Sequence, residues 1–427
     1  MINIKEFAEI LKVNFGLDRT QKIALAVSGG ADSMCMAFIM HTLGFAVTCL
    51  IVDHGLRPGS TAEAIETKTF LNYQGIEVII LKWLDYDEKL NISNIHQKAR
   101  DARYSLLIEY CIRNDIQHLA LAHNKNDQAE NVLIRIGRGT GIDGLAQMSS
   151  YKIIENITVI RPLLDYTRDE IEETLKQYNW PWVNDPSNLN PKFTRSRARE
   201  LLSSDNCLLT IDKLNLLSKN ALRTRDYLEK TTLATFYEVV TVKDLGYIKL
   251  DIQKFLTMHE EIQLRVLSCI LRSLNNKYSI RLNNLENLLN KIRHFEKWSD
   301  ATLHGCEILK IKQPYKLIFI REKNSIKSIV INKGVRRIIW DTRFIIELDS
   351  DLDEELRVEA LTKTCLPFLK NKLDNSITLE HNKLKWILPV MIKNNTVIAC
   401  PLLGWPGDKI KFKVTILSNV GKSLLVC

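Results

Sequence analysis

The stretch SGGADS, at residues 28–33, has residue types and spacing that suit the binding of a phosphate group. Gly29 and Gly30 allow backbone angles that other residues avoid, and they let a ligand approach the backbone closely. The helix-like run that follows would point free N–H groups and the positive end of its dipole at this loop, which favours an anion. Asp32 is the exception, because a carboxylate beside a phosphate is repelled unless a divalent metal ion lies between them. The loop therefore predicts a phosphate site with a metal ion or, more plainly, a strand–turn–helix junction.

A pair of carboxylates follows further along the chain. Asp127 and Glu130 stand three positions apart at the start of a predicted helix, so their side chains share one helix face. Such a pair can hold an ammonium group, but acidic residues early in a helix also complement the helix dipole, and the spacing alone favours this second role. Asp32 likewise belongs to a residue type that caps helix N-termini. Each of these carboxylates therefore has a chemical and a structural interpretation.

Arginines recur at helical spacing in the same part of the chain. Two pairs stand three positions apart, Arg100 with Arg103 and Arg135 with Arg138, while Arg195, Arg197 and Arg199 follow the turn-rich stretch 182–191. Guanidinium groups suit contacts with phosphate, whereas most arginines on protein surfaces are solvated or pair with nearby acids. Their spacing places each pair on one helix face without deciding between these roles.

The elements that must position these residues alternate between two periods over the first 200 residues. Strand-like runs occupy 22–27, 47–53, 77–81, 118–123 and 158–163. Helix-like runs lie between or after them, at 62–74, 93–113, 126–137 and 168–178. Nearly continuous apolar strands alternating with helices predict a parallel sheet covered by helices on both faces. Ligands bind such sheets at the carboxyl ends of the strands, where the loop at 28–33 and the stretches 52–57 and 122–128 all fall.

Beyond residue 205 the pattern changes, which predicts further domains. It is helical from about 206 to 295, and short alternating strands follow after 300. The sequence therefore predicts an α/β domain over 1–205, a helical and then β middle domain over 206–345, and a small α+β domain over 346–427. Lysines alternate with apolar residues in stretches such as DKIKFKVT (408–415), which gives a strand one basic and one buried face.

Composition narrows the class of protein. The net charge of +9 and the pI of about 8.9 favour polyanionic partners. The nine cysteines are scattered without a CxxC pair, which argues against a disulfide framework, a structural zinc site and an iron–sulfur cluster, and favours inert thiols in a reducing cytosol. The uncharged stretch 33–52 is broken by Gly44 and fits a buried helix and strand better than a membrane span. We expect a cytoplasmic protein without a membrane partner.

Several stretches together resemble the tRNA(Ile)-lysidine synthetases, a family within the PP-loop or N-type ATP pyrophosphatases. SGGADS matches the loop that characterises the larger group. The further blocks follow in the order of the family: VDHGLR (52–57), ARDARYSLL (99–107), AHNKNDQAENVLIRIGRGTGIDGLAQM (122–148), RPLLDYTRDEI (161–171) and WVNDPSN (182–188). One departure is Asn126, where the family commonly has Asp, which puts a third carboxylate role there in doubt.

The resemblance implies a PP-loop, Rossmann-like fold and a set of functional residues. ATP would bind at Ser28, Gly29, Gly30, Ala31, Asp32, Ser33, Asp53 and His54, with Mg²⁺ at Asp32. The catalytic residues would be Asp32, Asp127 and Glu130, of which the last two also recognise lysine. The tRNA would contact Arg100, Arg103, Arg135, Arg138, Arg195 and Arg199, together with the middle and C-terminal domains.

The activity implied by the resemblance is the conversion of the wobble cytidine of an isoleucine tRNA with a CAU anticodon to lysidine. Free L-lysine would be joined to carbon 2 of the base through an adenylated cytidine, with release of AMP and pyrophosphate. The oxygen on carbon 2 is a poor leaving group until AMP is attached, which accounts for the use of ATP. Alternatives are another PP-loop enzyme that modifies tRNA and a non-catalytic protein that binds nucleotide and RNA. A homodimer is compatible with the sequence, which does not decide the oligomeric state.

Overall fold

The structure is a computed structural model with two compact units, Met1–Arg225 and Asp226–Cys427. The part of the chain that it describes comprises 1–55, 59–83, 95–146, 148–183, 194–204, 208–275, 280–311, 315–352, 354–369, 372, 374, 377–408 and 410–416. The division between the units falls within one helix, α9 (Ile211–Val239). The domain boundaries expected at 205/206 and 345/346 stay predictions. In the described part of the chain, no helix is both long and apolar enough to cross a membrane.

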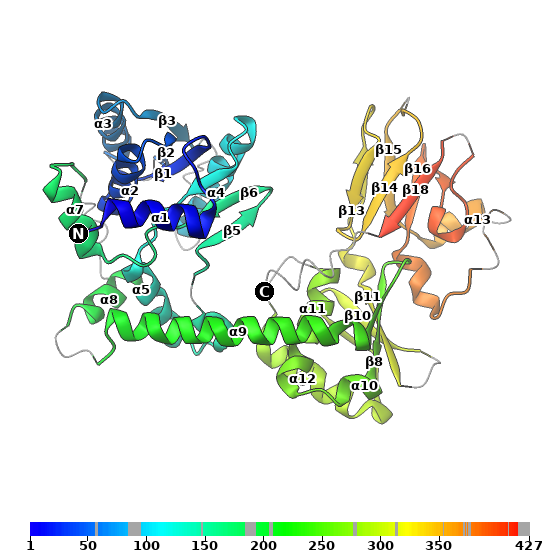
Figure 1. Ribbon diagram of the computed structural model, residues 1–427. Coiled ribbons are helices and arrows are strands. Elements are labelled where there is room, and N and C mark those ends of the chain that lie inside the picture. The colour runs from blue at the N-terminus through cyan, green and yellow to red at the C-terminus, as the bar shows by residue number, and fades with distance from the viewer. Residues whose placement is uncertain are drawn as a thin grey trace. The chain divides into compact units, whose positions relative to one another are not determined.

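The first unit contains an α/β sheet domain (Figure 1). Its elements before the end of the fourth strand are α1 (Ile4–Phe15), β1 (Lys22–Val27), α2 (Ala31–Thr42), β2 (Ala46–Asp53), α3 (Ser60–Tyr73), β3 (Glu77–Lys82), α4 (Ile95–Arg113) and β4 (His118–Ala120). Those after it are α5 (Lys125–Ile136), α6 (Ile142–Leu145), β5 (Tyr151–Ile154), β6 (Ile157–Ile160), α7 (Arg168–Gln177) and α8 (Thr194–Leu202).

The six-stranded sheet of this unit has the order β3-β2-β1-β4-β6-β5. Strands β1, β2, β3, β4 and β6 are mutually parallel, and β5 runs antiparallel to β6. The chain moves from β1 to β2 on one side and later returns to β4 on the other, so the order reverses at β1. In open α/β sheets such a reversal leaves a crevice at the carboxyl ends of the two strands involved. The loop at 28–33 and the residues after β4 therefore start from the same crevice.

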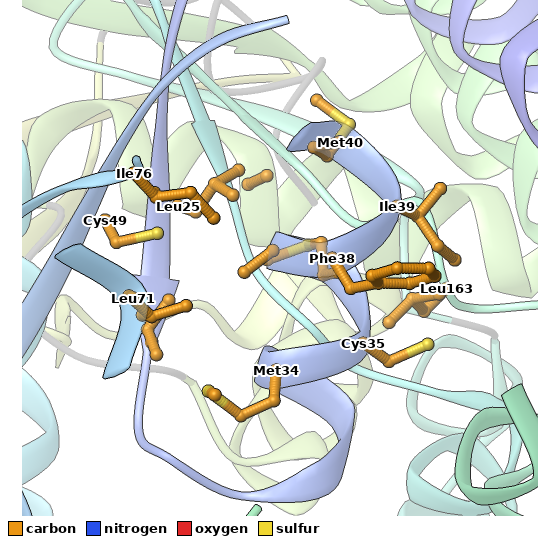
Figure 2. Packing of buried hydrophobic residues seen from close by; sticks show 14 of the residues in the cluster. Leu25, Met34, Cys35, Phe38, Ile39, Met40, Cys49, Leu71, Ile76 and Leu163 are labelled. Atoms are coloured by element: carbon orange, nitrogen blue, oxygen red, sulfur yellow. The ribbon is translucent and has the colours of Figure 1, made fainter. Parts of the chain in front are cut away.

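Both faces of this sheet are buried by helices, as the apolar strands predict. Along β1, Leu25 packs with α2 and α3, while Ala24 packs toward α4 on the opposite face. Figure 2 shows Met34 and Phe38 of α2 beside Leu25, within the larger apolar cluster. The parallel sheet with helices on both faces is thus confirmed.

The β5–β6 hairpin differs from the sequence expectation of a single strand at 158–163. Glu155 and Asn156 connect the two strands with φ of 49° and 71°. Positive φ at both central residues is typical of the two-residue turn that matches the twist of antiparallel strands, and Asn tolerates it well. The hairpin adds an antiparallel edge strand to an otherwise parallel sheet.

The second unit begins with a helical region and then forms three antiparallel sheets. Its first elements are β7 (Val240–Lys243), β8 (Tyr247–Asp251), α10 (Ile252–Leu256), α11 (Glu260–Leu274), α12 (Leu282–Arg293), η3 (Phe295–Lys297), β9 (Ala301–Leu303), β10 (Cys306–Lys310), β11 (Lys316–Arg321) and η4 (Lys323–Ser325). The remaining elements are β12 (Ile329–Ile331), β13 (Arg337–Trp340), β14 (Phe344–Leu348), β15 (Leu356–Ala360), η5 (Lys363–Cys365), α13 (Leu366–Leu369), η6 (Asn382–Ile387), β16 (Pro389–Lys393), β17 (Thr396–Ala399), η7 (Pro401–Leu403) and β18 (Phe412–Ile416). The strand orders are β7-β8-β11-β10-β9, β12-β15-β16-β17 and β13-β14-β18.

The helical and then β pattern expected after residue 206 is confirmed, except that the hairpin β7–β8 interrupts the helices. Helices α11 and α12 share an apolar core with β8, β10 and β11. On another side of the same sheet, Ile318 packs with Ile387 of η6. Residues of the five-stranded sheet and of the C-terminal part of the chain thus share a core.

A buried charge cluster lies in this second unit. Asp341 accepts hydrogen bonds from Arg321 and Arg343, and the side chains of all three are at most 4% exposed. Arg343 also donates to the backbone oxygens of Gly246 and Ile387, both at 3.1 Å. One carboxylate therefore pairs with two buried guanidinium groups, and Arg343 in turn joins two segments that are far apart in the sequence.

Candidate active site

The loop between β1 and α2 is held by its own hydroxyl groups. The backbone N–H of Ser28 donates to Ser33 Oγ at 3.1 Å, and Ser33 Oγ donates to the carbonyl of Gly30 at 3.0 Å. Gly30 is the N-cap of α2, and no side chain in the described part of the chain caps this helix. The first-turn N–H groups are therefore not used by a capping side chain, which leaves the positive end of the helix for an anion.

A cavity of about 570 Å³ opens at this loop, at the carboxyl ends of β1, β2 and β4. Its polar lining includes Ser28, Gly30, Asp32, Ser33, Asp53, His54, Ser60, Glu63, Arg100, Arg103, Tyr104 and His123. Its apolar lining includes Ala26, Val27, Leu50, Ile51, Val52, Ala64, Leu107, Leu121 and Ala122. The cavity thus offers both anion-binding groups and an apolar wall to one ligand.

The side chain of Asn124 links Asp32 to Asp127. Asn124 Nδ2 donates to Asp32 Oδ1 at 2.7 Å, while Asn124 Oδ1 accepts from the backbone N–H of Asp127 at 2.8 Å. Asn124 is fully buried at the N-cap of α5. Burial, together with the charge of Asp127, raises the pKa of Asp32 above its usual range, although the bond from Asn124 acts in the opposite direction. Helices α2 and α5 are therefore joined at the two positions predicted to carry the chemistry.

Asp127 and Glu130 lie beside α8 rather than in the lining of the cavity. Arg195 donates from Nε to Glu130 at 2.9 Å and from Nη2 to Asp127 at 3.2 Å. Arg199 donates from Nε to the other oxygen of Glu130 at 2.6 Å. The two predicted lysine-binding carboxylates and the two arginines predicted for tRNA thus form one ion-paired cluster, which is separated from Asp32 by Asn124.

Asp53 organises the turn after β2. Its carboxylate accepts from the backbone N–H of Gly55 at 3.0 Å and from the hydroxyls of Ser60 and Thr61 at 3.3 Å and 2.7 Å. Burial opposes ionisation, but these hydrogen bonds outweigh it and lower the pKa of Asp53. The side chain borders the cavity, and its role in nucleotide binding stays a prediction.

Two histidines border the cavity with unused ring nitrogens. Nδ1 of His54 and Nδ1 of His123 are buried and have no hydrogen-bond partner among the described residues. Burial lowers the pKa of His123 to about 4, although the charge of Asp127 favours its protonated form. Burial and the charge of Arg103 also lower the pKa of His54. Both rings are therefore neutral at neutral pH, with a nitrogen that a ligand could engage.

The arginine pairs lie in different surroundings. Arg100 and Arg103 of α4 line the cavity, where burial and the charge of Arg100 lower the pKa of Arg103. The guanidinium of Arg100 also lies 5.6 Å from the ring centre of Tyr104. Arg135 and Arg138 are exposed at the end of α5, and Arg135 donates to the carbonyl of Gly144. Only the α4 pair therefore borders the cavity.

Comparison with known proteins identifies the family of this chain. Residues 2–205 match the model of the PP-loop domain family. The chain is 34% identical to the tRNA(Ile)-lysidine synthase of Wolbachia pipientis wMel, over 97% of this chain and 96% of that relative. The chain belongs to the tRNA(Ile)-lysidine synthase family. Two further members are similar to it: that of Wolbachia sp. subsp. Brugia malayi (strain TRS), with 34% identity over 88% of both chains, and that of Rickettsia prowazekii (strain Madrid E), with 30% identity over 95% of this chain and 94% of the relative.

The match confirms the resemblance to the lysidine synthase family that the sequence motifs indicated. The residue roles taken from the motifs stay predictions. Asn126, the departure from the family pattern, accepts the backbone N–H of Arg168 at 3.0 Å through its side-chain oxygen. An aspartate could accept the same bond, so the exchange leaves this contact between α5 and α7 intact.

Sequence reasoning did not single out Asn124 as a functional residue of this family member. The local signal was present, because an Asn followed three residues later by Asp resembles the capping box at helix N-termini. Its second bond, to Asp32, joins positions 92 residues apart. That bond has no local signature and required the folded sheet to bring the two helix starts together.

Gly29→Ala is expected to destabilise this lysidine synthase-family chain more than Gly16→Ala. Both glycines have positive φ, 82° and 64°, which costs an alanine about 1 kcal/mol or more. At Gly29 an added Cβ would also meet Thr67 Oγ1 at 2.7 Å, whereas at Gly16 it would meet nothing within 4 Å. Urea unfolding midpoints measure the difference, and equal losses for the two variants would contradict the close approach.

Proposed function

We propose that the chain ligates free L-lysine to carbon 2 of the wobble cytidine of an isoleucine tRNA with a CAU anticodon. AMP is first transferred from ATP to the oxygen on carbon 2, with release of pyrophosphate. The ε-amine of lysine then attacks carbon 2, loses its proton and displaces AMP to form lysidine. The observation that carries this proposal is the link through Asn124, which places the phosphate-loop carboxylate Asp32 next to the Asp127–Glu130 cluster.

The cavity at the β1–α2 loop would bind ATP. Its polar end combines the uncapped start of α2 with the hydroxyls of Ser28 and Ser33 and the guanidinium groups of Arg100 and Arg103. These groups suit the triphosphate and the charge that develops when pyrophosphate leaves. The apolar wall formed by residues such as Leu50 suits a flat base.

Mg²⁺ fits this site through Asp32. In the described ranges of the chain, no group of three or more His, Cys, Asp or Glu side chains is arranged to hold a metal ion. Mg²⁺ is commonly held by one or two carboxylates together with the phosphates of its substrate, so a single aspartate in the phosphate loop is a suitable ligand set. When bound there, the ion would offset negative charge on the departing pyrophosphate.

The carboxylates of α5 would hold lysine. Because the lysine side chain has a pKa near 10.4, about one molecule in a few thousand carries a neutral ε-amine at pH 7. The site must therefore position that amine and provide a proton acceptor. Asp127 and Glu130 would bind the α-ammonium group, which leaves the ε-amine to extend past Asn124 toward the cavity.

Contacts with tRNA would extend beyond the cavity. Arg135 and Arg138 are exposed and would approach phosphates near the target base, which must leave its stack to be modified. Arg100 and Arg103 line the cavity, where they would contact the extruded nucleotide. Lys411 immediately precedes β18, and Lys413 is exposed on that strand, as expected for a basic face. Lys409 lies outside the described residues. The tRNA roles of Arg195, Arg199, the middle domain and the C-terminal domain stay predictions.

The test is incorporation of radiolabelled lysine into transcripts of isoleucine tRNA. We expect incorporation, together with release of AMP, only when ATP, lysine and a transcript with a CAU anticodon are all present. A transcript in which the first anticodon base is G instead of C is the matched control and should remain unlabelled. Release of AMP without incorporation of lysine, or labelling of both transcripts, would contradict the proposal.

The same experiment separates the alternatives. A non-catalytic protein would bind ATP without releasing AMP. A tRNA thiolation enzyme would need a reactive cysteine, but Cys35 beside the phosphate loop is buried, and burial raises its pKa to about 12. Such a thiol is a poor nucleophile at neutral pH.

A further inference from the structure

We propose that Arg195 binds the α-carboxylate of the free amino acid, so that the α5–α8 cluster recognises lysine as a zwitterion. This inference rests on the proposed function and assigns a specificity role within it. Asp127 and Glu130 hold the α-ammonium group, and Arg195 holds the carboxylate one carbon away. The cluster would then select a free amino acid over amines that lack a carboxylate.

The cluster contains both signs of charge within hydrogen-bond distance. Arg195 bridges Glu130 at 2.9 Å and Asp127 at 3.2 Å, using Nε and Nη2. Arg199 contacts Glu130 at 2.6 Å. Its two carboxylates and two guanidinium groups cancel in formal charge, so a zwitterion can bind without leaving a net charge in a largely buried place.

A free α-amino acid requires a cation near the subsite that binds its ammonium group. An ammonium group held by two carboxylates brings the attached α-carboxylate close to them, where like charges repel strongly at low dielectric. A cation must therefore lie beside the ammonium subsite for a free amino acid to bind. A guanidinium is well suited, because its fixed fork of donors matches a carboxylate.

Exposure distinguishes the two arginines. The side chain of Arg195 is 39% exposed, compared with 23% for Arg199 and 2% for Glu130. Arg195 is therefore the more accessible of the two guanidinium groups to an incoming ligand. Glu130 is enclosed by both arginines, so the ammonium group would contact it by replacing part of its pairing with Arg195. Four methylene groups separate the α-carbon of lysine from its ε-amine, so anchoring at this cluster leaves the reactive end free to extend toward His123 and the cavity.

Two other roles of Arg195 give different results. If Arg195 only holds the carboxylates in place, its removal changes the binding of every amine alike. If it contacts the tRNA backbone, its removal raises the KM for tRNA and leaves amine selectivity unchanged. A ratio between two amines that differ only at the α-carboxyl group is therefore the decisive measurement.

The experiment compares lysine with lysinamide, in which the carboxylate is a neutral amide, as substrates of the full chain. For the wild type we expect kcat/KM to favour lysine by about tenfold to a hundredfold, as for one charge-assisted hydrogen bond. Arg195→Ala should bring this ratio to within about twofold of unity. Arg197→Ala is the matched control, because Arg197 is an exposed arginine on the same helix, and the wild-type ratio should persist there.

The outcomes separate the inference from the proposed function. Absence of lysidine formation by the wild type would refute the function itself. Lysidine formation with an unchanged ratio in Arg195→Ala, whether or not the KM for tRNA rises, would refute only the inference. Thermal stabilisation of each variant by lysine and by lysinamide gives a second readout that needs no turnover. If Arg195→Ala does not fold, Arg195→Lys keeps a positive charge without the fork and should give a ratio between those of the wild type and unity.

Discussion

Asp32→Asn is expected to lower the rate of lysidine formation by about a hundredfold to a thousandfold, the effect of removing one well-placed electrostatic group from an active site. The asparagine has nearly the same shape and can keep the contact with Asn124 through its own side-chain oxygen. It lacks the charge that the phosphate loop needs to hold Mg²⁺ against the leaving pyrophosphate. Initial rates of incorporation of radiolabelled lysine measure the loss.

Stability provides the control for this variant. Some carboxylates have a higher pKa in the folded chain than in the unfolded chain. Above the pKa of the unfolded chain, ionisation of such a group favours unfolding, because the carboxylate ionises more easily in the unfolded chain. The pKa of Asp32 is raised by burial and by Asp127, so Asp32→Asn should keep or increase the unfolding temperature at neutral pH. Asp18→Asn, at an exposed turn after α1, should leave the rate unchanged. A folded Asp32→Asn chain with a rate within tenfold of the wild type would contradict the assignment.

Asp341→Asn is expected to destabilise the second unit by about 3–5 kcal/mol, because breaking a buried charge pair leaves uncompensated charge inside the protein. Here two guanidinium groups, those of Arg321 and Arg343, lose their common partner. Arg343 also joins the turn at Gly246 to Ile387, so its displacement would loosen the packing between these segments. Urea unfolding followed by tryptophan fluorescence measures the change, since Trp340 is buried next to the cluster.

Asp351→Asn provides the matched control for this stability prediction. Asp351 also pairs with an arginine, Arg336, at 2.7 Å, but both side chains are more than half exposed. Pairs in water contribute little to stability, because solvent screens them and ordering two long side chains costs entropy. Loss of stability no greater in Asp341→Asn than in Asp351→Asn would show that the buried cluster does not hold the unit together.

The sequence predicts the parallel core and the place of its crevice because these depend on local patterns. The apolar run 22–27 followed by two glycines and a helix start gives β1, the loop and α2 directly. The β5–β6 hairpin is harder to predict, because its turn uses Glu155, a residue type with no preference for positive φ. In the sequence, β5 and this turn therefore look like an ordinary loop between two elements.

The candidate site could be predicted as a set of residues but not as a set of contacts. Asp32 and Asp127 lie in recognisable motifs, whereas the arginines of α8 follow the last of these motifs in the chain. Asn124 separates Asp32 from Asp127, and Arg195 bridges both α5 carboxylates. These contacts depend on hydrogen bonds between residues that are 65 to 92 positions apart in the chain. Spacing within one helix does not specify what another helix brings to it. The pairing of Arg195 with these carboxylates therefore could not be predicted from its spacing, and its contact with tRNA stays a prediction.

The cysteines of the described residues make the chain its own reporter of unfolding. All of them are buried, with Cys35, Cys49 and Cys111 in the first unit and Cys269, Cys306, Cys365 and Cys400 in the second. An alkylating reagent reaches such thiols only when the surrounding core opens, and peptide mass spectrometry assigns each modified position. The rate of cysteine modification therefore reports the unfolding of each unit separately, without an engineered label.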